Sequence, residues 1–311
     1  MAEPEGVETL LIDAYRLLTL RDLAGASGCL DRALAVDYED AELLHAMKCA
    51  AWWKDSMERI DARKEPFEAG ELALERWKAF TVFAARLGGD FPRSIQAFRC
   101  FAFGVALSHY EALAADGEPS DPELLRRLGC ARKGVGDHER AVRYLEAAAK
   151  HRKDDASVLA ELADAYDLLG EQRASKALFR EAFFLNPQKV ELELIESASM
   201  AKLVARTVEL GRTGHETAEW IPVYGELAGV FSVKRELKPI EAGKLKQSIY
   251  ELETELAADG SRRAILVPRL INRYFWIVDH YLARREDKAR VDEILLKIKL
   301  LDANVYKQYI A

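Results

Sequence analysis

The stretch "LADAYDLLGEQRASKALFREAFFLNP", residues 162–187, contains two short segments separated by Gly170. In each segment apolar residues recur at spacings of three and four, which is the period of an amphipathic helix. A glycine between two such segments favours a tight left-handed turn, and the closing Asn186-Pro187 pair favours a stop. The stretch therefore predicts a helix–turn–helix.

The same apolar period continues through nearly the whole chain of 311 residues, 50% of which are hydrophobic. The alternating β-branched runs that are typical of strands are absent, and short connectors with Gly or Pro separate the periodic segments. The pattern predicts about 14 helices, at residues 7–20, 22–35, 41–60, 67–87, 92–115, 122–134, 138–152, 156–169, 172–184, 190–210, 216–231, 238–258, 263–284 and 288–302. Because no connector is long, we expect a single helical domain over residues 1–311.

The two helices of the opening stretch belong to an internal repeat. A shift of 34 residues places residues 122–155 on residues 156–189 in register. The shift matches positions of the same type or size, namely Leu125 with Leu159, Leu128 with Leu162, Ala131 with Ala165, Gly136 with Gly170, Leu145 with Phe179 and Ala148 with Ala182. The small residues allow two helices to approach closely, so the repeat predicts two successive helix hairpins.

This pattern resembles the tetratricopeptide repeat, a helix–turn–helix of 34 residues with characteristic Gly, Ala, aromatic and closing Pro positions. The second copy has Tyr166 and Pro187 where the family has Tyr and Pro, whereas the first copy has Arg132 and Lys153 there. The resemblance implies an all-α fold, a right-handed α-solenoid of antiparallel helix hairpins.

The resemblance is specific over residues 122–189 and fainter elsewhere. Residues 7–40 and 272–305 keep part of the pattern as degenerate copies. We therefore expect degenerate or long helix pairs over residues 7–115 and degenerate or capping helices over residues 190–311, all extending one array.

The chain is mildly acidic, with 52 Asp and Glu against 45 Lys and Arg and a net charge of −7. This balance disfavours a general nucleic-acid binder. Residues 259–311 nevertheless carry 11 basic against 7 acidic residues, net +4, which leaves room for a basic docking end.

Targeting signals are not evident in the sequence. The initial segment MAEPEG lacks the basic-then-apolar pattern of a secretory signal, and no apolar run approaches the roughly 20 residues of a membrane span. The four cysteines show neither metal-ligand nor redox-motif spacing, which favours free thiols in a reducing compartment. We expect a cytoplasmic protein, although a signal removed before residue 1 would leave no trace.

In tetratricopeptide proteins, ligands usually lie in a groove lined by the first helix of each repeat. The side chains next to the packing positions on these helices are Arg126, Cys130 and Lys133 in the first copy and Ala160, Asp164 and Asp167 in the second. They predict either a groove for a peptide of mixed charge or an ordinary solvated helix face. A chaperone's C-terminal carboxylate is disfavoured as the ligand, because Asp164 stands where the family's clamp needs a neutral or basic side chain.

A second candidate surface lies on the helix expected at 263–284. Arg273, Trp276 and His280 share one face at spacings of three and four. Trp and Arg are enriched at interface hot spots, so this face is a candidate for partner binding. The alternative is that Trp276 packs against a neighbouring helix.

Catalytic patterns are sparse. The six histidines form no metal-binding pair one helical turn apart, no glycine-rich phosphate loop follows a strand, and no G-x-S-x-G motif occurs. We therefore expect no enzymatic activity, no cofactor, no metal and no small-molecule substrate.

Together these observations predict a non-catalytic adaptor, scaffold or assembly chaperone that holds a partner peptide or helix in a concave groove. Two alternatives remain open at this stage. The chain could be a self-associating structural subunit of a larger assembly, or its basic C-terminal end could dock onto an anionic partner, either nucleic acid or a membrane surface.

Overall fold

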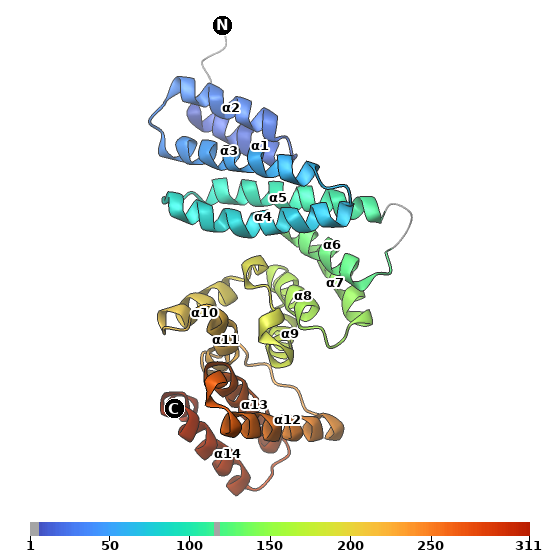
Figure 1. Cartoon of the computed structure of the whole chain (residues 1–311), viewed down its shortest axis with the longest axis vertical. Coiled ribbons are helices and arrows are strands. Elements are labelled where there is room, and N and C mark those ends of the chain that lie inside the picture. Colours follow the sequence, from blue (N-terminus) through green and yellow to red (C-terminus); the bar gives the residue numbers. More distant parts are fainter. Residues whose placement is uncertain (1–5, 115–118) are drawn as a thin grey trace. The chain divides into compact units, whose positions relative to one another are not determined.

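The computed structural model describes residues 6–114 and 119–311 (Figure 1). These residues form fifteen α-helices and three short 3-10 helices and contain no strand, and helices adjacent in the chain pack together in pairs. The predicted all-α fold class is confirmed, and the paired packing is consistent with an α-solenoid. The contacts divide the chain into two compact units, residues 1–151 and 152–311, and each is described by itself.

The first unit contains the helices α1 (Val7–Thr19), α2 (Leu23–Val36), α3 (Ala41–Asp61), α4 (Pro66–Leu87), α5 (Pro92–Leu113), α6 (Pro122–Gly134) and α7 (His138–His151). Their starts follow local signals. Asp40 and Asp121 accept hydrogen bonds from backbone N–H groups in the first turns of α3 and α6, and prolines occupy the first position of α4, α5 and α6.

The core of the first unit is rich in aromatic rings. Trp53 is fully buried against Phe80 and Phe101, with ring centroids 5.6 and 5.5 Å apart, and joins α3 to α4 and α5. The neighbouring Trp52 is half-buried and lies over Phe83 of α4. Helix α5 is buried nearly all round because α1, α4 and α6 all pack against it.

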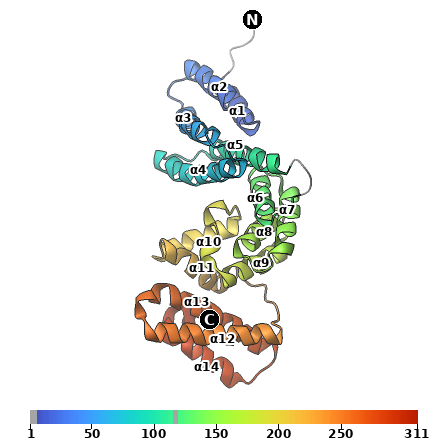
Figure 2. The same ribbon diagram turned by 45° about the vertical axis from the view of Figure 1, so that its right-hand side comes forward.

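The second unit contains α8 (Ala156–Leu168), α9 (Gln172–Leu185), α10 (Ala198–Glu209), α11 (His215–Leu227), α12 (Pro239–Ala258), α13 (Arg263–Ala283), α14 (Lys288–Leu301) and α15 (Ala303–Ile310). Helix α13 is central, because α11, α12 and α14 pack against it and most of its side chains are buried. Figures 1 and 2 show α12, α13 and α14 side by side.

The repeat pattern predicts its hairpins well and fails just after them. Gly136 and Gly170 have φ angles of 87° and 84°, which confirms the left-handed turns that end α6 and α8. The helix expected over residues 190–210 begins only at Ala198, after two short 3-10 turns at Pro187–Lys189 and Leu192–Leu194. The last helix, α15, has no counterpart among the expected helices.

Candidate functional site

The three candidate residues of α6 are buried in the structure. Cys130 and Lys133 are fully buried, and Arg126 is 6% exposed with its guanidinium 2.6 Å from Glu123 one turn earlier. They therefore do not form a solvated helix face. Their role in partner binding stays a prediction.

Asp164 of α8 is fully buried and is bound within the second unit. Its carboxylate accepts hydrogen bonds from the backbone N–H groups of Glu196, at 2.9 and 3.0 Å, and of Ser197, at 2.7 Å. Ser197 in turn caps α10 through the N–H of Met200. Asp164 thus holds the backbone just before α10, and the cap by Ser197 accounts for the start of this helix at Ala198.

The other two candidates of α8 have separate environments. Ala160 packs in a hydrophobic cluster with residues of α9, α10 and α11. Asp167 is half-buried, and its carboxylate accepts a hydrogen bond of 2.7 Å from the side chain of Gln172 across the turn between α8 and α9. Asp164 and Asp167 therefore have different partners and different exposure.

The candidates Arg273 and Trp276 of α13 share a face, as expected, and this face packs on α9. Trp276 is 2% exposed, and its ring centroid lies 4.3 Å from that of Phe184. Arg273 donates from Nη1 to the carbonyl oxygen of Phe184 at 2.6 Å, and its guanidinium carbon lies 3.9 Å from the Phe184 ring centroid. Packing against a neighbouring helix, the alternative for Trp276, is therefore what the structure contains.

A buried ionic network lies next to Trp276 and joins α9, α11 and α13. Arg180 pairs with Asp279 and lies 3.4 Å from Glu226, while Lys234 lies 3.2 Å from Glu226 and 2.5 Å from Asp279. The side chains of Arg180, Glu226 and Asp279 are all less than a tenth exposed. Burial raises the pKa of Glu226 above its ordinary value, although both cations oppose this shift. The sequence gives no local signal for this network, because its members span about a hundred positions.

His280, the third candidate on α13, is 6% exposed. Burial lowers its pKa below the ordinary value, and the positive charges of Arg284 and Lys246 add to this effect. The folded chain therefore favours the neutral imidazole of His280. When the chain unfolds at mildly acidic pH, this imidazole takes up a proton.

This shift predicts a pH dependence of stability. As the pH falls through the unfolded-state value of about 6.5, the stabilisation linked to neutral His280 should be lost. We expect wild type to lose stability relative to His280→Gln as the pH falls from neutral to about pH 5. Urea denaturation at several pH values measures it, and a difference independent of pH would contradict the expectation.

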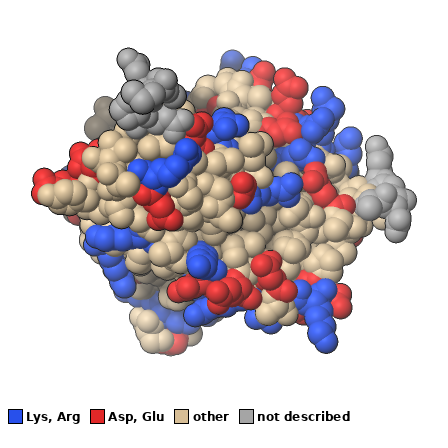
Figure 3. Space-filling view, turned by 90° about the horizontal axis from the view of Figure 1, so that it is seen from above, with Lys and Arg blue, Asp and Glu red and all other residues tan. Residues whose placement is uncertain are grey.

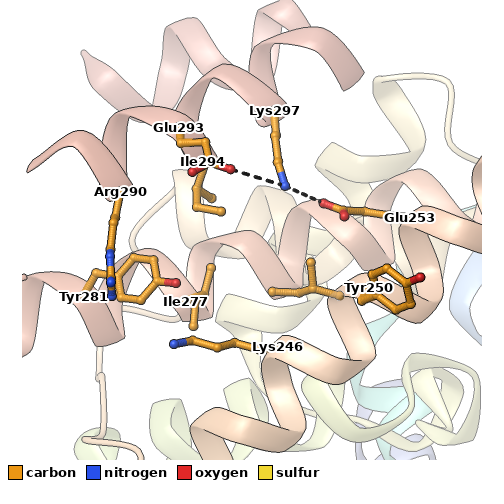
Figure 4. Close-up of a pocket in the computed structure, with 10 residues that line it drawn as sticks. Lys246, Tyr250, Glu253, Ile277, Tyr281, Arg290, Glu293, Ile294 and Lys297 are labelled. Atoms are coloured by element: carbon orange, nitrogen blue, oxygen red, sulfur yellow. Dashed lines mark hydrogen bonds and ion pairs between the residues drawn. The ribbon is translucent and has the colours of Figure 1, made fainter. Parts of the chain in front are cut away.

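Two open cavities of the second unit lie on neighbouring faces of α12. The first, which we call the α12–α14 cleft, has a volume of about 270 Å³ between α12, α13 and α14 (Figure 4). Its floor is apolar and its rim is mostly charged. The lining residues are Ile249, Ile277, Ile294, Tyr250, Tyr281, Lys246, Glu253, Arg290, Glu293 and Lys297.

The rim of the α12–α14 cleft combines paired charges with aromatic side chains. Lys297 of α14 lies 2.9 Å from Glu253 across the cleft and 3.7 Å from Glu293 one turn earlier on its own helix. Tyr250 at one end is 70% exposed, whereas Tyr281 at the other end is buried (Figure 4). An exposed tyrosine beside buried isoleucines offers both apolar area and a hydrogen-bonding group.

The second cavity, which we call the α9–α12 pocket, has a volume of about 340 Å³. Its apolar lining consists of Phe184, Leu185, Leu237 and Leu245, and its charged lining of Asp154, Glu181, Arg235, Glu241, Lys244 and Arg273. Arg235 lies 2.9 Å from Glu181 and 3.0 Å from Glu241, so these three charges are bound to one another. Of the nine candidates from the sequence, Arg273 alone lines either cavity.

Within residues 6–114 and 119–311, no group of three or more His, Cys, Asp or Glu side chains is arranged to hold a metal ion. In the same ranges, none of the helices has both the length and the apolar character needed to cross a bilayer.

No family model matches this chain, and no curated protein matches it. The resemblance to the tetratricopeptide repeat therefore rests on the internal pattern of residues 122–189.

Proposed function

We propose that this chain is a non-catalytic binding scaffold, and that its second unit holds a segment of a partner protein in the α12–α14 cleft. The observation that carries the proposal is the apolar floor of Ile249, Ile277 and Ile294 in an open cleft, framed by charges and by the exposed Tyr250. An amphipathic segment buries its apolar side chains on such a floor, while rim charges set its register.

Charge and composition support a protein partner over nucleic acid. Basic and acidic side chains are interspersed over the face drawn in Figure 3, and the rim of the cleft also carries both signs. A nucleic-acid surface needs a continuous basic patch instead. Free cysteines such as Cys29 and Cys49 suit a reducing compartment, so we propose a cytoplasmic location.

The proposal predicts that two changes in the cleft abolish partner capture and leave the fold intact. The variant combines Lys246→Glu with Tyr250→Ala, because both side chains are exposed and line the cleft. Affinity capture from cell extract, read by mass spectrometry, should show at least one protein bound to wild type and reduced about tenfold or more on the variant.

A matched control changes the same residue properties elsewhere on the second unit. Lys288→Glu and Ile240→Ala alter exposed side chains that line neither cavity. This control should capture the same protein as wild type, and all three proteins should melt at the same temperature. If the cleft variant retained every protein that wild type captures, the proposal would be wrong.

A further inference from the structure

Arg273 is a largely buried cation that has no anionic partner among the described residues. Its one hydrogen bond runs from Nη1 to the carbonyl oxygen of Phe184, and its guanidinium also lies over the Phe184 ring. Its Nε is buried and has no acceptor within the part of the chain that the structure describes. A buried charge is normally paired, because desolvation of an unpaired ion is costly.

The carboxylates near Arg273 are already bound by other arginines. Glu219 accepts two hydrogen bonds from Arg269, at 2.6 and 2.8 Å. Glu181 accepts two from Arg235, at 2.9 and 3.1 Å. Burial, with a smaller contribution from Arg269, lowers the pKa of Arg273 to about 10, which is far enough above neutral pH to keep the guanidinium charged.

A water molecule would not compensate the buried positive charge of Arg273. A cavity of about 30 Å³ lies between Arg273, Asn272 and Glu219, which is room for about one water. Such a water supplies Nε with a hydrogen-bond acceptor but leaves the positive charge without a counter-charge. An anion from outside the chain supplies the missing counter-charge.

The α9–α12 pocket gives that anion a route to Arg273 and restricts its chemistry. Phe184, Leu185, Leu237 and Leu245 provide apolar walls, so a fully hydrated ion gains little from entering. Lys244 and Asp154, which are both exposed, add one positive and one negative charge to the lining. Both Glu181 and Glu241 are engaged by Arg235. A group that fits is a carboxylate carried next to an apolar side chain.

We propose that an Asp or Glu side chain of a partner peptide enters the α9–α12 pocket and pairs with Arg273, while an adjacent apolar residue of the peptide packs on Leu237 and Leu245. A planar carboxylate accepts paired hydrogen bonds from a guanidinium, which makes arginine the suitable recognition residue. This inference rests on the proposed scaffold function and assigns a ligand chemistry to a second site in the same unit.

The test is a selection of random peptides displayed on phage against the full chain. Wild type should enrich peptides with Asp or Glu beside Leu, Ile or Phe, and Arg273→Met should lose this pair. For a synthesised enriched peptide, fluorescence polarisation should show binding weakened about tenfold or more by Arg273→Met. Changing the acidic residue of the peptide to its amide should cost wild type a similar factor and cost Arg273→Met almost nothing.

Stability separates this role from a structural one. Because Arg273→Met removes an unpaired buried charge, its free energy of unfolding should equal or exceed that of wild type. If Arg273→Met failed to fold, the conservative Arg273→Lys variant would replace it. Combined with the amide change in the peptide, it would still measure the interaction between residue 273 and the acidic residue of the peptide. Equal enrichment on Arg273→Met and wild type would overturn the inference.

The selection also distinguishes this inference from the proposed function. Loss of peptide binding on the Lys246→Glu and Tyr250→Ala variant, with no effect of Arg273→Met, would overturn the inference and leave the α12–α14 cleft as the binding site. Enrichment that neither variant changes would overturn both.

Discussion

Replacing Asp279 by alanine should lower the free energy of unfolding by about 3–5 kcal/mol. Asp279 is buried and pairs with both Arg180 and Lys234. The truncation therefore leaves these two cations with Glu226 as the remaining carboxylate of the network. Removing one member of a buried ionic network costs more than the pair contributes, because the remaining charge stays desolvated. Urea denaturation of the full chain, followed by circular dichroism, measures the loss.

An exposed ion pair provides the matched control. Arg206 and Glu209 lie 3.3 Å apart on α10, with both side chains about two-thirds exposed. Glu209→Ala should therefore change the free energy of unfolding by less than about 1 kcal/mol. Combining Asp279→Leu with Arg180→Met should cost less than the two single changes together, because the pair is removed as a unit. Equal effects of Asp279→Ala and Glu209→Ala would contradict the buried network.

Replacing Asp164 by alanine should destabilise the chain by about 3 kcal/mol. The change removes a buried carboxylate and leaves the backbone N–H groups of Glu196 and Ser197 without this acceptor. The start of α10 then loses its attachment to α8, so hydrogen exchange should speed up at residues 196–200. Denaturation and hydrogen exchange together measure both effects.

Asp167 is the control on the same helix. It is half-buried and accepts one hydrogen bond from Gln172, so Asp167→Ala should cost less than about 1 kcal/mol. If Asp164→Ala instead left stability unchanged and removed only partner binding, Asp164 would be a groove charge and its structural role would be wrong.

The sequence predicts the helix hairpins because their signals are local. Gly170 needs a positive φ, and the apolar period on either side of it requires a helix on each side, so residues 156–185 fold as the pattern indicates. The burial of Asp164 is not predictable in this way. Its hydrogen-bond donors lie more than 30 positions later, in a segment where the repeat pattern has ended.

Long-range contacts also explain why the face of α13 that carries Arg273 and Trp276 is buried. The spacing of Arg273 and Trp276 correctly places them on one face, because helical geometry fixes it. That this face is covered by Phe184 of α9, about 90 positions earlier, depends on tertiary packing. Tyr250 shows the converse case. It lies on an ordinary helical segment of the sequence, and only the placement of α14 makes it the exposed end of a cleft.

We have proposed that the second unit binds its partner through the α12–α14 cleft and not through the first-helix positions of the repeat. Hydrogen–deuterium exchange of the full chain, with and without the protein that wild type captures and the Lys246→Glu and Tyr250→Ala variant loses, distinguishes these two surfaces. We expect slower exchange in α12 and α14, around Tyr250 and Lys297, with α6 unchanged. Slower exchange confined to α6 and α8, around Arg126 and Asp164, would contradict it.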